Sequence, residues 1–208
     1  MTEDEARAWL DERNVPRGTL DRIGEFATFL LAENQHQNLI AASTGDQMWA
    51  RHIVDSVQLL DLVGVGNWLD LGSGAGFPGL IVAAVSDRRV TLVESRAKRI
   101  AFLNEAAVIL GIADRVEILG ARAELLPQRT YAVISARAFA PLPKLLKIAH
   151  RFATDATTWV LPKGRSARSE LAEIARSWQG DFRVVPSVTD SEAAIIVARN
   201  VRPGSKRR

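Results

Sequence analysis

The sequence predicts an α/β protein with a mostly parallel, seven-stranded sheet, helices on both faces and an N-terminal helical extension. Three observations support this prediction. Short apolar runs alternate with amphipathic segments from residue 68 onward, as strands alternate with crossover helices in parallel sheets. The first run, 68–71, leads directly into a glycine-rich turn. The second run, 90–93, ends in an acid, Glu94, about 20 residues beyond those glycines, which is typical of nucleotide-binding βαβ units.

The composition limits the class of protein. The chain has 208 residues, 47% of them hydrophobic, which is enough for one sizeable α/β domain and a helical extension. It has no cysteine and only three scattered histidines, so we expect no disulfide, no cysteine nucleophile and no metal site. No apolar run reaches the ~18 residues of a membrane span, and the acidic N-terminus does not resemble a signal peptide. We therefore expect a cytoplasmic protein.

The predicted organisation has three parts, which are a helical extension packed on the core (1–64), a catalytic α/β domain (65–200) and a basic, flexible tail (201–208). The extension begins with a helix over 3–13, where Thr2 and Glu5 have the spacing of a capping box. A second helix, 19–35, carries an apolar stripe that would pack on the α/β domain. A third helix is predicted to start at Thr44 as its N-cap and to continue to residue 62.

The α/β domain should alternate strands and helices along its length. The predicted strands are 68–71, 90–93, 116–119, 131–135, 157–161, 182–186 and 193–198, and the predicted helices are 80–85, 96–110, 141–151 and 166–178. Ser95 is expected to cap the second of these helices and Gly111 to end it. We expect the fourth strand to lie beside the first. The strand order then reverses at the first strand, and open α/β sheets bind ligands at such a reversal.

The glycine-rich turn is the strongest candidate for a cofactor site. The segment DLGSGAGFPG, residues 70–79, places Gly72 and Gly74 directly after the first strand, where backbone N–H groups could approach a ligand. Asp70 precedes the glycines at the strand tip, where its carboxylate could face the ammonium group of a bound amino acid. These features favour S-adenosylmethionine over a nicotinamide dinucleotide, although the G-x-G-x-x-G spacing alone is weak evidence.

Other candidate residues follow the neighbouring strands at the same edge of the sheet. Glu94 is placed to accept hydrogen bonds from ribose hydroxyl groups. Ala123 and Glu124 follow the third strand, where a small residue leaves room for a flat adenine. Arg137 follows the fourth strand and would point into the cleft. The sequence therefore predicts one ligand site shared by four loops.

Positive charge is concentrated in one part of the chain. Between residues 137 and 168 there are seven Lys or Arg against the single acid Asp155, whereas the whole chain has a net charge of only +3. A block of this kind can be an ordinary solvated face or a nucleic-acid-binding surface. If it binds RNA, we expect its phosphate contacts to be Lys144, Lys147, Lys163, Arg165 and Arg168.

Several motifs taken together resemble one known family. They are NL (38–39), RHIVDS (51–56), DLGSGAGFPG (70–79), ES (94–95), RAE (122–124), SARAFAPL (135–142) and PKG (162–164), which are similar to the motifs of the RsmG (GidB) family. The resemblance implies a class I methyltransferase fold and S-adenosylmethionine-dependent methylation of a guanine N7 in 16S ribosomal RNA. The implied partner is that RNA or the small ribosomal subunit, and we expect a monomer.

The resemblance also implies roles for individual residues. Cofactor contacts would come from Gly72, Phe77, Ala123, Glu124 and Arg137, to which the spacing argument adds Gly74 and Glu94. Arg51 and His52 would shape the RNA entrance, whereas helix spacing alone suggests an ordinary ion pair between Arg51 and Asp55. The sequence departs from the family at Ile40, where many members have threonine, and in the polar segment 34–37.

Methylation of guanine N7 requires no general base, because N7 already offers an in-plane lone pair. Catalysis would come from orientation and electrostatics. Arg137 cannot bind O6 and N7 together, since N7 is the nucleophile, so it would hold the cofactor carboxylate or contact O6 alone. Two alternatives remain at this stage: a nicotinamide-dependent oxidoreductase that uses the same turn, and an RNA-binding module without catalytic activity.

Overall fold

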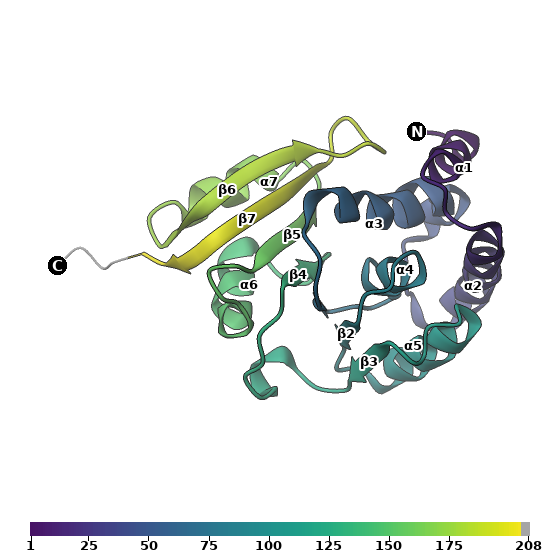
Figure 1. The fold of residues 1–208 in the computed structure, drawn as a ribbon, viewed down its shortest axis with the longest axis horizontal. Helices are drawn as coiled ribbons and strands as arrows, with labels where there is room; N and C mark the ends of the chain where they lie inside the picture. The colour runs from purple at the N-terminus through teal and green to yellow at the C-terminus, as the bar shows by residue number, and fades with distance from the viewer. Residues whose placement is uncertain (205–208) are drawn as a thin grey trace.

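The computed structural model describes residues 1–204 and confirms the predicted α/β architecture. Seven strands form one sheet in the order β3-β2-β1-β4-β5-β7-β6, with helices on both faces (Figure 1). All neighbouring strands are parallel except for β7, which is antiparallel to both β5 and β6. Because β1 lies between β2 and β4, the order of the strands reverses at β1, as predicted.

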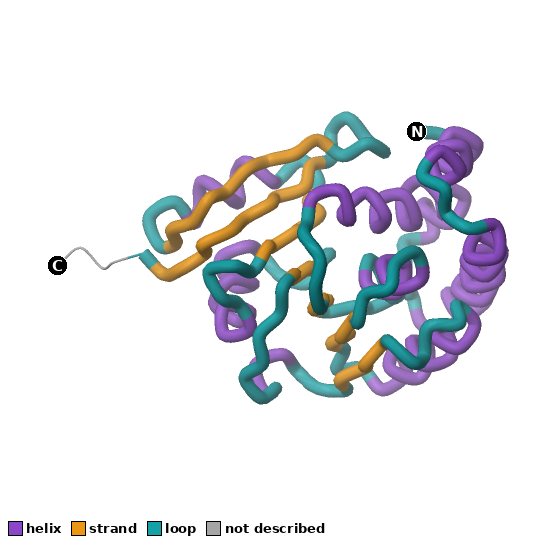
Figure 2. Tube along the Cα trace, viewed as in Figure 1, coloured by secondary structure: helices purple, strands orange, loops and turns teal. Residues whose placement is uncertain are grey.

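The strands match the predicted ranges closely in the first half of the sheet and less closely at its end. They are β1 (Trp68–Leu71), β2 (Val90–Val93), β3 (Val116–Leu119), β4 (Val133–Ala136), β5 (Thr158–Lys163), β6 (Trp178–Pro186) and β7 (Ala194–Pro203). β6 and β7 are longer than predicted and form an extended hairpin (Figure 2). β7 therefore extends past the proposed domain boundary at residue 200, and the rest of the proposed tail, 205–208, lies outside the described residues.

The helices of the α/β domain begin within one residue of the predicted positions, and all except the first are shorter than predicted. The α-helices of the protein are α1 (Glu3–Glu12), α2 (Arg17–Gln37), α3 (Asp55–Val57), α4 (Gly79–Ala84), α5 (Ala97–Ile109), α6 (Leu142–Ala149) and α7 (Ala167–Ile174). The prediction that Ser95 caps α5 is wrong. The N-cap is Arg96, and the free N–H groups of Ser95 and Arg96 both donate to the Glu94 carboxylate.

Two hydrophobic cores cover the two faces of the sheet. Trp68 and Val133 pack into the core formed with α2, α4 and α5, whereas the adjacent Leu69 and Ile134 pack into the core formed with α6. All four residues of β1, β2 and β4 are buried, which explains why these strands appear as short continuous apolar runs. No helix within residues 1–204 is both long enough and apolar enough to cross a membrane.

The third helix of the extension is not continuous. Residues 42–62 form a 3₁₀ helix η1 (Ala42–Gln47), a π-helical turn η2 (Trp49–Val54), α3 and a second 3₁₀ helix η3 (Gln58–Leu62). Thr44 is not an N-cap; its hydroxyl donates to the Ala41 carbonyl, 2.8 Å away. The carboxylate of Glu3 instead accepts from the N–H groups of Trp49 and Ala50, at 3.0 and 2.9 Å. The Thr2–Glu5 capping box at the start of α1 is confirmed.

A buried polar chain joins β1 to β4 at the point where the strand order reverses. Trp68 Nε1 donates to Ser135 Oγ at 2.7 Å, and Ser135 Oγ donates to Asp70 Oδ1 at 2.6 Å. All three residues are fully buried. Asp70 therefore lies behind the cleft and does not reach its surface, which corrects the expectation that it faces a bound amino acid.

The close approach of α4 to the sheet generates a stability prediction. A Cβ atom on Gly79 would lie 2.2 Å from Leu92 Cδ2 and 3.0 Å from Asp70 Oδ2. We expect Gly79→Ala to lower the free energy of unfolding by about 1–3 kcal/mol, because overpacking forces buried groups to shift. Urea denaturation would measure this change.

The matched control is Gly24→Ala in α2, where no atom lies within 4 Å of the new methyl group. That substitution should raise the stability by up to about 1 kcal/mol through helix propensity alone. Equal effects from the two substitutions would contradict the close packing described for Gly79.

Candidate functional site

The glycine-rich turn between β1 and α4 allows close packing at the edge of the sheet, but most of its N–H groups are already used within the protein. The N–H groups of Gly72 and Ser73 both donate to the Val93 carbonyl, at 2.9 and 3.1 Å, and the N–H of Gly74 donates to Glu94 Oε2 at 3.2 Å. Gly72 has φ of +69° and a Cβ atom there would lie 2.5 Å from Phe139 Cδ2, so only glycine fits. The backbone N–H groups that were expected to approach a ligand are therefore already hydrogen-bonded within the protein.

Glu94 is held rigidly at the tip of β2. Its Oε1 accepts from Ser95 N at 2.7 Å and from Arg96 N at 2.9 Å, and its Oε2 lies 3.7 Å from Arg99 Nη1. The side chain is only 6% exposed. A carboxylate has about four acceptor positions, and the long contact to Arg99 leaves Oε2 able to accept a ligand hydroxyl.

A cavity of about 410 Å³ lies above the turn, at the carboxyl ends of β1, β2 and β4. Its lining brings together most of the predicted cofactor residues: Gly72, Glu94, Ala123 and Glu124, together with Arg99, Ala138, Phe139 and Lys144. Ala123 is buried at the start of the short 3₁₀ helix η4 (Ala123–Leu125). The volume lies within the range of sites for small molecules.

A second, larger cavity of about 750 Å³ adjoins the first. It is lined by residues of the extension, the tip of β4 and the tip of β5, including Thr44, Arg51, His52, Asp55, Arg137, Pro162, Lys163 and Glu170. Ala138, Phe139 and Ala140 line both cavities. Ala138 has φ of +52°, a strained conformation for a residue with a side chain, and such strain is concentrated at functional sites.

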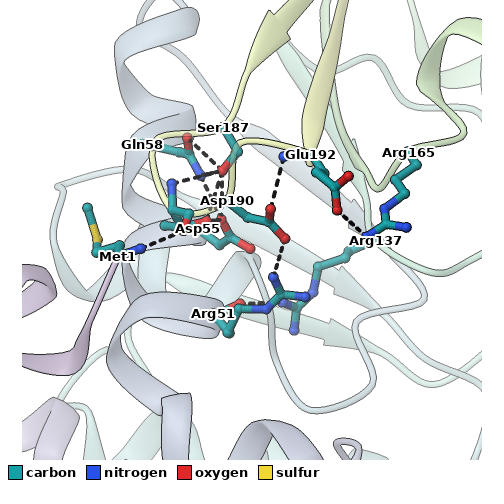
Figure 3. A network of polar contacts seen from close by, with 10 residues as sticks. Met1, Arg51, Asp55, Gln58, Arg137, Arg165, Ser187, Asp190 and Glu192 are labelled. Atoms are coloured by element: carbon teal, nitrogen blue, oxygen red, sulfur yellow. Dashed lines mark hydrogen bonds and ion pairs between the residues drawn. The ribbon is translucent and has the colours of Figure 1, made fainter.

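Arg137 belongs to the lining of the second cavity and is absent from that of the first. Its Nη1 donates to the Arg51 carbonyl at 3.3 Å and to His52 Nδ1 at 3.1 Å. Its guanidinium also lies over the ring of Phe77, 4.9 Å from the centroid. Figure 3 shows Arg137 beside Arg51, from which it takes this backbone contact.

His52 forms the link between Arg137 and the extension. Because an arginine can only donate, His52 Nδ1 must accept, and the ring proton lies on Nε2. Nε2 then donates to Thr44 Oγ1 at 3.0 Å. Burial, together with the charges of Arg137 and Arg51, lowers the pKa of His52 to about 3. His52 is therefore neutral and orients Arg137.

Phe77 does not line either cavity. It is buried, stacks on His52 with ring centroids 4.9 Å apart and packs edge-on against Phe26. Its side chain supports the His52–Arg137 pair from below, while the proposal that it contacts the cofactor rests on the family resemblance alone. The spacing of His52 and Phe77 in the sequence gives no signal of this stacking.

The predicted RNA-contacting cations fall into two groups. Three of them form ion pairs: Arg51 with Asp190 at 2.6 Å, Lys163 with Glu170 at 2.7 Å, and Arg165 with Glu192. Lys144 and Lys147, on the exposed face of α6, and Arg168, exposed on α7, form no ion pair with the described residues. The i, i+4 ion pair suggested for Arg51 and Asp55 does not form, because Asp55 accepts from Ser187 and Thr189 instead.

Comparison with known proteins identifies the family. A model of the GidB family, described as rRNA small subunit methyltransferase G, matches residues 19–199. The chain belongs to this family. It is 60% identical to the ribosomal RNA small subunit methyltransferase G of Rhizorhabdus wittichii, over 99% of this chain and 96% of that protein. The protein of the same name from Zymomonas mobilis is 49% identical over 98% of this chain and 96% of its own length.

Solved structures support the fold assignment of the GidB family member. An RNA methyltransferase from Salinibacter ruber, in complex with S-adenosylhomocysteine, aligns with a TM-score of 0.55 at 20% identity, over 75% of this chain and 93% of that chain. The glycopeptide N-methyltransferase MtfA, in complex with S-adenosylmethionine, aligns with a TM-score of 0.61 at 8% identity, over 71% of this chain and 93% of that chain.

The predictions of enzyme class and cofactor are confirmed by family membership: the GidB family member is an S-adenosylmethionine-dependent methyltransferase of ribosomal RNA. The two alternatives, an oxidoreductase and a non-catalytic RNA-binding module, are not supported. Within residues 1–204 no group of three or more His, Asp or Glu side chains is arranged to hold a metal ion.

The low pKa of His52 generates a pH prediction. The unfolded chain binds a proton at His52 below its usual pKa of 6.5, whereas the folded protein resists protonation down to about 3. Stability from this residue is therefore complete above pH 6.5 and is lost as the pH falls, by up to about 1.4 kcal/mol per pH unit. Urea denaturation of the wild type and of His52→Gln between pH 7 and pH 4 would measure it. Parallel curves for the two proteins would contradict the buried neutral histidine.

Proposed function

We propose that this methyltransferase transfers the methyl group of S-adenosylmethionine to N7 of a guanine in the RNA of the small ribosomal subunit. The observation that supports this most directly is the pair of adjoining cavities at the carboxyl edge of the sheet, which share the wall Ala138–Ala140. The first has the size and lining for the cofactor. The second is large enough for an RNA base, and its lining includes the donors Arg51, Arg137 and Lys163 beside the acids Asp55, Glu170 and Glu173.

The residues of the first cavity fit the cofactor. The Oε2 atom of Glu94 would accept a hydrogen bond from a ribose hydroxyl, as acids at the tip of the second strand do in nucleotide-binding sheets. Ala123, buried at the far side, leaves room for the adenine ring, and the neighbouring Glu124 could bind its edge. Gly72 would let the methionine part of the cofactor approach the backbone. Gly74 lies outside both cavity linings and contributes through the hydrogen bond from its N–H to Glu94. When bound, S-adenosylmethionine supplies an electrophilic methyl group.

The second cavity would receive the guanine. Arg137 lies in its lining with Nη1 occupied by the Arg51 carbonyl and His52, so its remaining N–H groups could donate to O6 of the base. The same position at the shared wall also allows a contact with the cofactor carboxylate. Both roles depend on the orientation that His52 imposes on the guanidinium.

The transfer itself requires no proton movement. The N7 lone pair would form the new bond to the methyl carbon while the bond between that carbon and sulfur breaks. The electron pair of the broken bond stays on sulfur, which becomes a neutral thioether. The positive charge passes to the imidazole ring of the guanine. The protein therefore contributes orientation and electrostatics, which agrees with the neutral state of His52 beside the site.

Surface cations would hold the RNA around the target base. Lys144 and Lys147 are exposed on α6, next to the shared wall, and would contact phosphates without first breaking an ion pair with a described residue. The target guanine must be unpaired or presented by folded RNA, since N7 has to reach the cofactor.

The role of Arg137 is testable by substitution. We expect Arg137→Ala to lower kcat/KM for methyl transfer by about 100-fold or more, as loss of an oriented charged donor does in other active sites. Arg137→Lys should recover little, because an ammonium cannot reproduce the guanidinium geometry. Single-turnover transfer assays and isothermal titration with S-adenosylmethionine would separate chemistry from cofactor binding. Unchanged transfer and unchanged cofactor affinity together would refute the assignment.

The site of methylation tests the proposed function itself. Ribosomal RNA from a strain that lacks this gene should accept one labelled methyl group on a guanine N7 of the small-subunit RNA. The same RNA with 7-deazaguanine at that position should accept none, because the nucleophilic nitrogen is replaced by carbon. Label on an exocyclic amine, on carbon or on large-subunit RNA would contradict the proposal.

A further inference from the structure

Two acids on a single turn hold Arg51 and Arg165, two of the cations that the sequence analysis expects at the RNA. The turn connects β6 to β7 and comprises residues 187–193. Asp190 Oδ2 lies 2.6 Å from Arg51 Nη1, and the Glu192 carboxylate pairs with the Arg165 guanidinium. Figure 3 shows Asp190 directed at Arg51 and Glu192 directed at Arg165. Neither acid has a role in the methyl-transfer chemistry described above.

The turn is anchored, so the acids are held in place. Asp55 Oδ1 accepts from the hydroxyl groups of Ser187, at 3.1 Å, and of Thr189. Gln58 Oε1 accepts from the N–H of Val188 at 3.0 Å. The N-terminal amino group donates to the Thr189 carbonyl at 3.1 Å, so the turn also contacts the start of the chain, as Figure 1 shows.

Asp190 is further fixed by a local contact. Its Oδ1 accepts from the N–H of Glu192 at 2.9 Å while Oδ2 holds Arg51. These contacts lower the pKa of Asp190, so the carboxylate is ionised at neutral pH. The turn therefore presents a fixed negative charge to Arg51.

Both ion pairs are accessible to water and can exchange partners. The side chains of Arg51 and Asp190 are 39% and 33% exposed, and those of Arg165 and Glu192 are 80% and 57% exposed. Exposed pairs of this kind contribute little to stability, and an arginine that binds a carboxylate can bind a phosphate in its place. Arg51 also lines the larger cavity, so its partner affects the place where the base would enter.

The third ion pair provides a contrast. Lys163 and Glu170 are only 12% and 15% exposed, and the Glu170 carboxylate also accepts from Leu142 N at 2.9 Å and from Ser166 Oγ at 2.8 Å. Glu170 thus joins α6, α7 and the tip of β5, and its pair with Lys163 is part of the fold. Asp190 and Glu192 lie on a surface turn, and their side chains do not join helices to the sheet in this way.

We propose that Asp190 and Glu192 are specificity-determining residues for the RNA substrate. Their carboxylates occupy Arg51 and Arg165, so neither arginine offers a free phosphate site to an unrelated RNA, which also meets the repulsion of both acids. The target RNA is held by the guanine cavity and by Lys144 and Lys147, and it requires neither arginine. The inference rests on the proposed function and adds to it the means by which non-target RNA is rejected.

Neutralisation of the acids tests the inference. The variants are Asp190→Asn, Glu192→Gln and the double substitution, and the probes are the unmethylated small-subunit RNA and an unrelated single-stranded RNA of equal length. We expect the affinity for the unrelated RNA to rise about threefold to fivefold in each single variant and more than tenfold in the double variant. The affinity for the target RNA should change by less than about twofold.

The salt dependence provides a second measurement. Each neutralised acid should make the plot of log affinity for the unrelated RNA against log salt steeper by about 0.7, because one more arginine becomes available to release a counterion. The matched control is Asp87→Asn, which changes the same charge at an exposed position just before β2, at the opposite edge of the sheet. That variant should leave the ratio of the two affinities and the salt slope unchanged.

Two outcomes would overturn the inference. The first is that the ratio of the affinities for the target and the unrelated RNA in the double variant stays within about twofold of the wild-type ratio. The second is that Asp87→Asn changes this ratio as much as the variants of the turn do, which would show a general charge effect. If Asp190→Asn failed to fold, Glu192→Gln alone would test the inference, because Glu192 and its partner Arg165 are both exposed. If the wild type transferred no methyl group to ribosomal RNA, the proposed function would fail, and the binding comparison would still test the two acids.

Discussion

The parallel pairing of β1 with β4 is the constraint on which the site depends. It places Leu71, at the end of β1, beside Ala136, at the end of β4, so the glycine turn and Arg137 emerge next to each other. The buried chain from Trp68 through Ser135 to Asp70 fixes this pairing from behind. Burial raises the pKa of Asp70, and the Ser135 hydroxyl offsets part of that effect by donating to the carboxylate. The polar groups of this chain thus hold the two strands in register without facing the ligand.

Two cavities lie around this pairing. The loops after β1, β2 and β3 line the cavity proposed for the cofactor, whereas the extension and the tips of β4 and β5 line the cavity proposed for the base. The extension therefore contributes directly to the second cavity: Thr44, through His52, sets the orientation of Arg137. The strained Ala138 and the ring of Phe139, packed on Gly72, lie at the boundary where the methyl group would pass.

The sequence allowed the sheet order and the residues at its edge to be predicted because both follow local rules. Apolar runs, glycine spacing and an acid at a strand tip locate Gly72 and Glu94 without any knowledge of packing. The roles of Asp70, Thr44 and Phe77 could not be predicted in this way. Asp70 is drawn into the core by Ser135, 65 residues away, and Thr44 and Phe77 meet His52 from separate segments. The acids Asp190 and Glu192 gave no signal, since surface acids are common in turns and only the fold brings them to Arg51 and Arg165.

A crystal structure of the protein with S-adenosylhomocysteine and a guanine nucleotide would test the central claim most directly. The account predicts the nucleoside part of the cofactor product in the cavity of Gly72, Glu94 and Ala123, and the guanine in the cavity of Arg137, with N7 directed at the sulfur across the wall Ala138–Ala140. Cofactor density in any other place, or a guanine whose N7 is bound by Arg137 and turned away from the sulfur, would contradict it.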